Sequence, residues 1–198
     1  MAYKDLLVQI DDTRACAQRI DAAVGLAARL DAHVTGLYLV PELIGASFSD
    51  GYLPAEVQAE IARTANERAN EALAKFTAAA DRAGVRADQR MDLGLTPDFA
   101  ELLGLHARYA DLVIMGQPES GDEGFGPSPE VVVLGSGRPV LVVPYIGAPA
   151  GFGQKIAIAW SATRESARAV GDALPLLEQA DSVSVVMVNP KSGERGHG

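Results

Sequence analysis

Short aliphatic runs alternate with long alanine-rich stretches along most of the chain. The runs are rich in Val, Ile and Leu and carry few charges, which is typical of strands covered on both faces. The alanine-rich stretches repeat apolar residues every three or four positions, as amphipathic helices do. The alternation predicts an α/β fold with an open parallel sheet and helices on both faces. We expect the strands near residues 5–11, 33–40, 86–92, 111–116 and 139–144.

The expected helices differ in length and in how they begin and end. The longest runs from Ala55 to Ala83, and Gly84 stands where a left-handed residue ends a helix. One face of this helix is marked by Val57, Ile61, Ala65, Ala69, Ala72 and Phe76. The strand that follows is more polar than the others, which favours the edge of the sheet. Further helices are expected after Thr13 to about Leu30 and from the N-cap Thr96 and Pro97 to about Arg108. A short helical or irregular segment is expected near Glu130–Leu134, and a loop over residues 41–54.

The beginning of the chain is repeated near its end. Lys155–Asn189 again reads strand, helix, strand, and Thr13-Arg14 falls on Thr163-Arg164 when the two copies are aligned. A length of 198 residues fits one domain of about 150 residues and a remainder too short for a second. We therefore expect a complete domain over 1–146, a linker over 147–154, a partial second repeat over 155–190 and a solvated tail over 191–198.

Composition and charge exclude several classes of partner. The formal net charge is −9 and the isoelectric point is near 4.8, whereas duplex nucleic acid and anionic membranes need a basic surface. The single cysteine, Cys16, excludes an intramolecular disulfide. The opening apolar run is short and broken by acids, unlike a signal peptide or a membrane span. The sequence predicts a soluble, cytoplasmic protein that binds neither nucleic acid nor membranes.

Most motifs that carry chemistry are missing from the chain. No lysine follows a glycine, so there is no P-loop, and no G-x-G-x-x-G follows the first strand. Gly135-Ser136-Gly137 precedes a strand, whereas the Ser of a nucleophile elbow follows one. We interpret His33 and His106 as structural or solvated residues rather than metal ligands, and Trp160 as a packing residue.

A candidate crevice remains at the carboxyl ends of two strands. Asp11 follows the first strand and Met115-Gly116 ends the fourth. If these strands are neighbours, a carboxylate faces a glycine across the crevice where ligands bind in such sheets. That carboxylate could accept a base amino group or a ribose hydroxyl. An equally weighted alternative is that Asp11, Asp12 and Thr13 only cap the first helix.

Cys16 has two interpretations as well. A thiol in the first turn of a helix can have a lowered pKa and act as a nucleophile. A small buried hydrophobic residue is the interpretation we favour.

Four segments together resemble a universal stress protein of the tandem kind. They are KDLLVQIDDT, ADLVIMG, LGSGRPVLVVP and KIAIAWSATRESARAV, and the resemblance covers essentially the whole chain. It implies a five-stranded parallel sheet of order 3-2-1-4-5. One branch of the family binds ATP through an aspartate after the first strand and a G-x2-G-x9-G-(S/T) loop after the fourth.

The resemblance assigns four residues to a nucleotide crevice and then departs from the ATP-binding pattern. Asp11 matches the adenine-side aspartate, Val40 the backbone contact that ends the second strand, and Met115 and Gly116 the start of the phosphate loop. Further along, Glu119 stands in place of a glycine and Pro129-Glu130 in place of the glycine–serine pair. Gly135-Ser136 imitates that pair too close to the fifth strand, and Ser161 replaces the aspartate in the repeat.

The resemblance with these departures implies a non-enzymatic stress-response protein that binds a small molecule or a protein. The alternative is an ATP-binding member with very slow hydrolysis or autophosphorylation, in which backbone amides of Gly121, Gly124 and Gly126 replace the usual loop. A third possibility from another class is an adenylating or hydrolytic enzyme, but that needs an S-G-G-x-D-S-type loop where I-D-D-T-R stands. No cofactor is assigned with certainty, and ATP is the candidate.

Two further expectations concern binding. The loop after the fourth strand carries the acids Glu119, Asp122 and Glu123, which would repel phosphates and weaken nucleotide affinity. The partial repeat exposes an apolar strand pair that one helix, Arg164–Gln179 with an interruption at Pro175, covers on one face only. We expect this pair to drive self-association, most simply as a homodimer.

Overall fold

The structure is a computed structural model of the chain and describes residues 2–42, 47–48, 51–52, 54–95, 98–118 and 127–188. The chain divides into two compact units. The first is Tyr3–Ala148, and the second contains the described residues from Pro149 onward.

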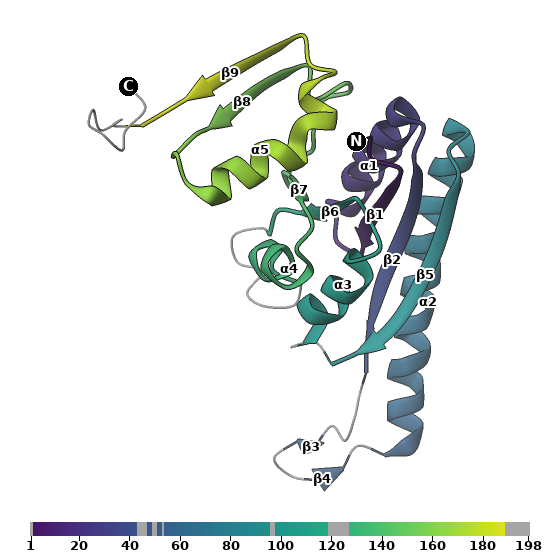
Figure 1. Ribbon diagram of the computed structural model, residues 1–198. Coiled ribbons are helices and arrows are strands. Elements are labelled where there is room, and N and C mark those ends of the chain that lie inside the picture. The colour runs from purple at the N-terminus through teal and green to yellow at the C-terminus, as the bar shows by residue number, and fades with distance from the viewer. Residues whose placement is uncertain are drawn as a thin grey trace. The chain divides into compact units, whose positions relative to one another are not determined.

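The first unit is built on a five-stranded parallel sheet with the order β5-β2-β1-β6-β7 (Figure 1). This is the predicted 3-2-1-4-5 arrangement, which confirms the expected fold class. The central strand pairs Leu6 with Val34 on one side and with Leu112 on the other. The strands are β1 (Asp5–Ile10), β2 (His33–Pro41), β5 (Ala87–Gly94), β6 (Leu112–Gly116) and β7 (Val140–Val143), and the helices are α1 (Cys16–Leu30), α2 (Ala55–Ala83), α3 (Phe99–Ala107) and α4 (Pro129–Ser136).

Two pairs of helices cover the two faces of this sheet (Figure 1). On one face Leu103 of α3 and Val132 of α4 pack with Met115 of β6, and all three are fully buried. On the other face lie α1 and α2, and the ring of Phe76 packs directly over Gly36 of β2. Burial from both sides explains the continuous apolar runs of the central strands. The polar strand β5 lies at an edge, as predicted.

The first turns of α2 differ from the prediction. On the face predicted from the sequence, Ala69, Ala72 and Phe76 are buried, but Val57 and Ile61 are 42% and 41% exposed. A helix of 29 residues is about 43 Å long, whereas the nine residues of β2 span about 30 Å. The N-terminal part of α2 therefore extends beyond the sheet (Figure 1). Among the described residues, even this longest helix lacks the sustained apolar stretch needed to cross a membrane.

Two other local expectations have different outcomes. The loop expected over residues 41–54 contains two short antiparallel strands, β3 (Ser47–Phe48) and β4 (Gly51–Tyr52), so that expectation is wrong in part. Pro41 also still belongs to β2, opposite Gly94. The N-cap expected at Thr96-Pro97 lies outside the described residues.

The second unit consists of β8 (Lys155–Ala159), α5 (Arg164–Leu177) and β9 (Ser182–Val186). The two strands are parallel, and Thr163 forms a capping box with Ser166 at the start of α5. The interruption expected at Pro175 is wrong, because the helix continues through it to Leu177. Pro175 stands in the last turn, where the loss of one N–H donor affects a single hydrogen bond.

The close contact between Gly36 and Phe76 provides a test of the packing. A Cβ added at Gly36 would lie 2.7 Å from ring atoms of Phe76. We expect Gly36→Ala to lower the free energy of unfolding by about 1–3 kcal/mol, because the fully buried ring has little room to move. Denaturant unfolding followed by circular dichroism measures this change.

A matched control is Gly25→Ala in α1, where a Cβ would meet nothing within 4 Å. That substitution should be neutral or raise stability by up to about 1 kcal/mol, because alanine is the better helix former. Equal effects at the two glycines would contradict the packing described for Phe76.

Candidate functional site

Two of the residues singled out in the sequence lie at the carboxyl ends of neighbouring strands of the first sheet. Asp11 directly follows β1, and Gly116 ends β6. These strands are parallel neighbours at the centre of the sheet, and the chain leaves β1 for β2 on the opposite side. This is the place where the strand order reverses and where open α/β sheets bind ligands. The side chain of Arg19 contacts both residues, so the structure brings them together.

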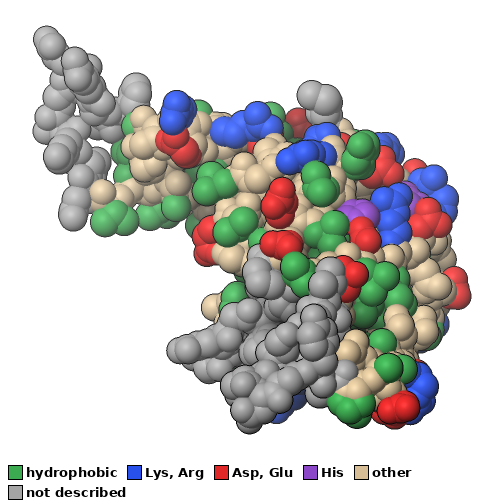
Figure 2. Space-filling view, turned by 90° about the horizontal axis from the view of Figure 1, so that it is seen from below, with side chains coloured by type: hydrophobic (Ala, Val, Ile, Leu, Met, Phe, Trp, Pro, Cys, Tyr) green, Lys and Arg blue, Asp and Glu red, His purple; other side chains and the backbone are tan. Residues whose placement is uncertain are grey.

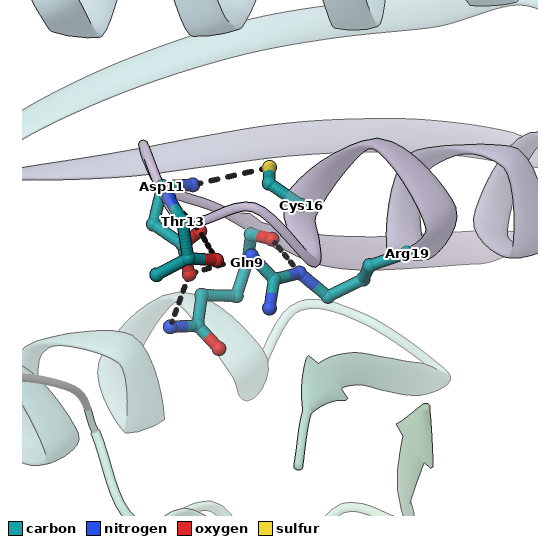
Figure 3. A network of polar contacts seen from close by, with 5 residues as sticks. All are labelled: Gln9, Asp11, Thr13, Cys16 and Arg19. Carbon is teal, nitrogen blue, oxygen red and sulfur yellow. Dashed lines mark hydrogen bonds and ion pairs between the residues drawn. The ribbon is translucent and has the colours of Figure 1, made fainter. Parts of the chain in front are cut away.

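The Asp11 carboxylate is surrounded by donors from its own chain (Figure 3). Its Oδ1 accepts hydrogen bonds from the backbone N–H and the hydroxyl of Thr13, at 3.0 and 2.5 Å. Its Oδ2 accepts from the Gln9 amide at 3.4 Å and lies 2.5 Å from Nη2 of Arg19. A carboxylate offers about four acceptor positions. Three hydrogen bonds and one ion pair from the same chain therefore already engage Asp11.

Arg19 is the buried cation of this group. Its side chain is only 3% exposed, compared with 24% for Asp11. Its Nε donates to the carbonyl of Gln9 at 2.7 Å, which holds the guanidinium beside Gln9 (Figure 3). Its Nη2 is buried, and its contact with Asp11 is an ion pair by distance rather than an aligned hydrogen bond.

Gly116 is a glycine for a steric reason that involves Arg19. A Cβ at this position would lie 2.1 Å from Nη1 and 3.3 Å from Cζ of Arg19. No side chain fits there while the guanidinium holds its place. The backbone of Gly116 thus forms one wall of the space that Arg19 fills.

The alternative role of these residues as helix caps is wrong. The N-cap residue of α1 is Ala15, and no side chain makes a capping hydrogen bond there. Asp11 and Thr13 bond to each other instead. Asp12 points to α2, where Arg68 lies 3.6 Å from its carboxylate.

The side chains of Met115 and Val40 pack elsewhere in the first unit. The Met115 side chain is fully buried in the core between the sheet, α3 and α4, so only its backbone is available to a ligand. Val40 lines a hollow of about 300 Å³ between the ends of β2 and β5 and the helix α2. None of Asp11, Met115 and Gly116 lines that hollow. Its other described lining residues are Pro41, Glu42, Gln58, Ala59, Ala62, Asn66 and Leu93.

Burial also sets the protonation of two groups near Asp11. Burial raises the pKa of the Cys16 thiol, and the charge of Arg19 opposes this rise only in part. The thiol accepts a hydrogen bond from the backbone N–H of Asp11. Burial, followed by the charges of Asp12 and Asp11, raises the pKa of Tyr38 to about 12. Both groups are therefore neutral near pH 7, and Cys16 is a buried residue without thiolate character, as we favoured.

A family model identifies the relatives of the chain. The model of the universal stress protein family matches residues 2–144, which is most of the chain and nearly all of the first unit. The chain belongs to the universal stress protein family. No curated protein sequence matches it significantly.

Solved universal stress proteins share the fold of this one. The protein UspA from Lactobacillus plantarum is 18% identical, with a TM-score of 0.55 over 72% of this chain and 98% of that one. A universal stress protein in complex with cAMP is 21% identical, with a TM-score of 0.52 over 72% and 98%. A universal stress protein from Archaeoglobus fulgidus is 14% identical, with a TM-score of 0.72 over 96% of this chain and 67% of that one.

The two histidines of the described chain pair with carboxylates in this universal stress protein. His33 lies between Asp5 and Asp88, with the shorter contact of 3.2 Å to Asp88. His106 lies 2.9 Å from Asp92. The part of the chain that the structure describes contains no group of three or more acidic, His or Cys side chains able to hold a metal ion.

Sequence reasoning missed Arg19. The residue stands three positions after Cys16 and one before Ile20, both of which are buried in α1. Helical spacing therefore places a cation on the buried stripe, where arginine is rare unless it is paired. A cation on the buried face of the helix indicates that a carboxylate lies opposite it.

The state of Cys16 provides a second test. We expect an aromatic disulfide reagent to label the native thiol slowly near neutral pH, on the order of a hundredfold slower than in denaturant, because labelling needs local opening. Absorbance of the released thiolate measures the rate, and Cys16→Ala supplies the blank. Equally fast labelling of native and denatured protein would show an exposed thiolate.

Proposed function

We propose that this universal stress protein is a non-enzymatic regulatory binding protein whose nucleotide site is degenerate. The observation that carries the proposal is the state of Asp11, whose carboxylate is engaged by Thr13, Gln9 and Arg19. A ligand amino group would have to compete with these contacts. The departures from the ATP-binding pattern at Glu119 and Pro129-Glu130 point in the same direction.

The residues beside Asp11 also support a binding role over a catalytic one. A nucleophile needs an accessible, activated atom. Cys16 is buried and has a raised pKa. The hydroxyl of Thr13 donates to Asp11 within the same turn.

A second candidate is an ATP-binding protein with slow hydrolysis or autophosphorylation. The observation in its favour is the relative solved in complex with cAMP, which has the same fold. In this alternative the amides of Gly121, Gly124 and Gly126 hold the phosphates, and these residues lie outside the described ones. A small molecule or a protein remains the proposed partner of the degenerate site.

Affinity for ATP separates the two candidates. The segment after β6 carries Glu119, Asp122 and Glu123. Each carboxylate at 6–8 Å from a phosphate costs on the order of 2 kcal/mol at an effective dielectric near 20, before salt screening. We expect isothermal titration to detect no ATP binding below roughly millimolar concentration, since even the screened sum weakens binding by about tenfold or more.

Low-micromolar binding, or ATP released by acid from the purified protein, would favour the second candidate instead. Replacing the three acids by Glu119→Gln, Asp122→Asn and Glu123→Gln gives the matched control and should strengthen any residual binding. Turnover of ATP with release of pyrophosphate would indicate an adenylating enzyme and contradict both candidates.

We also propose that the chain associates with itself through the apolar strand pair, by which we mean β8 and β9. Two parallel strands alone bury too little to be stable. Every residue of β9 is exposed, with Val185 at 63%, and Val188 just beyond it is 85% exposed. The helix α5 packs beside β8, and Pro175 is its one buried residue. Exposed hydrophobic side chains also occur among charged ones on the face shown in Figure 2.

Light scattering tests this association. We expect the full chain to give the mass of a dimer or a larger assembly, because open strand edges and apolar patches recruit partners. A chain that ends at Gly151 lacks the apolar strand pair and should give a smaller assembly. A monomeric full chain whose residues 155–188 are rapidly cleaved by protease would contradict the proposal.

A further inference from the structure

Arg19 occupies the space between the two residues that define the crevice. Its Nη2 faces Asp11, its Nη1 lies against Gly116, and its Nε is held by the Gln9 carbonyl. The buried guanidinium thus already contacts the two groups, the Asp11 carboxylate and the Gly116 backbone, that a ligand in the crevice would have to reach.

We propose that Arg19 is an internal occupant of this crevice, which competes with the N–H donor of a ligand for Asp11 and so determines which ligands the site accepts. The inference rests on the proposed function, because it assumes that the crevice is a degenerate nucleotide site. It adds that Arg19 is the residue that weakens binding and that the base of the nucleotide is the part affected. Arg19 therefore blocks the side of the site that would receive the base.

Charge explains why the occupant stays in place. An amino group of a nucleobase is a neutral donor, whereas Arg19 brings a full positive charge to the same carboxylate. Moving Asp11 to a ligand would leave a buried guanidinium without its counter-charge, which is strongly unfavourable. A neutral ligand therefore gains less from Asp11 than the protein loses.

The second unit supports the coupling of these two residues. When the repeat is aligned on Thr13 and Thr163, Ser161 stands in place of Asp11 and Ala169 in place of Arg19. The cation and the carboxylate are absent together. That is expected if each is retained because the other is present.

The test uses adenosine, which has the base and ribose but no phosphates, and compares the full chain with Arg19→Met. Methionine has a similar length and suits a buried position. We expect Arg19→Met to bind adenosine at least tenfold more tightly than the unaltered chain in isothermal titration. The gain should disappear in Arg19→Met combined with Asp11→Ala. Arg82→Met makes the same change in net charge at an exposed position and should leave affinity unchanged.

Each other result overturns the inference. A folded Arg19→Met with no gain for adenosine shows that the arginine does not block the site, and a gain that survives Asp11→Ala shows that Asp11 is not what it blocks. Loss of the cooperative melting transition in both Arg19→Met and Arg19→Gln shows a structural residue rather than an occupant. Low-micromolar ATP binding by the unaltered chain instead overturns the proposed function, whatever the variants do with adenosine.

Discussion

A guanidinium cannot be buried unless a carboxylate and hydrogen-bond acceptors face it. Arg19 satisfies this requirement with Asp11 and the Gln9 carbonyl, and these contacts arrange the carboxyl ends of β1 and β6. Asp11 turns toward α1, Thr13 closes a turn on its other oxygen, and Gly116 must lack a side chain. One interaction thus accounts for two residues, Asp11 and Gly116, that resemble parts of a ligand site.

The same residues would be interpreted differently in a protein without the arginine. An aspartate after the first strand and a glycine after the fourth are what a nucleotide crevice needs. Here the carboxylate is engaged and the glycine makes room for a side chain of the same protein. A family scaffold can therefore keep the aspartate and the glycine of such a site while both contact a side chain of the same protein.

The two units illustrate how burial decides the extent of a domain. In the first, five strands between two helix layers bury a continuous core that includes Phe76 and Met115. In the second, one strand–helix–strand unit leaves β9 exposed along its length. The second unit nevertheless forms both strands and the helix, and Thr163 makes a full capping box at the start of α5. Local sequence propensity specifies the individual strands and helices, whereas the number of packed layers decides how large a core they bury.

The fold could be predicted from the sequence because it depends on the spacing of hydrophobic residues and on the order of strands and helices along the chain. Aliphatic runs, alanine-rich stretches and Gly84 specify strands, helices and one helix end by short-range rules, and the family resemblance adds the strand order. The partners of individual side chains could not be predicted in that way. Asp11 was equally compatible with a helix cap and a ligand contact, because both need an exposed acceptor at the end of a strand. Only the tertiary structure places the Arg19 guanidinium against it, since a helix position gives a residue's face but not the atoms opposite that face.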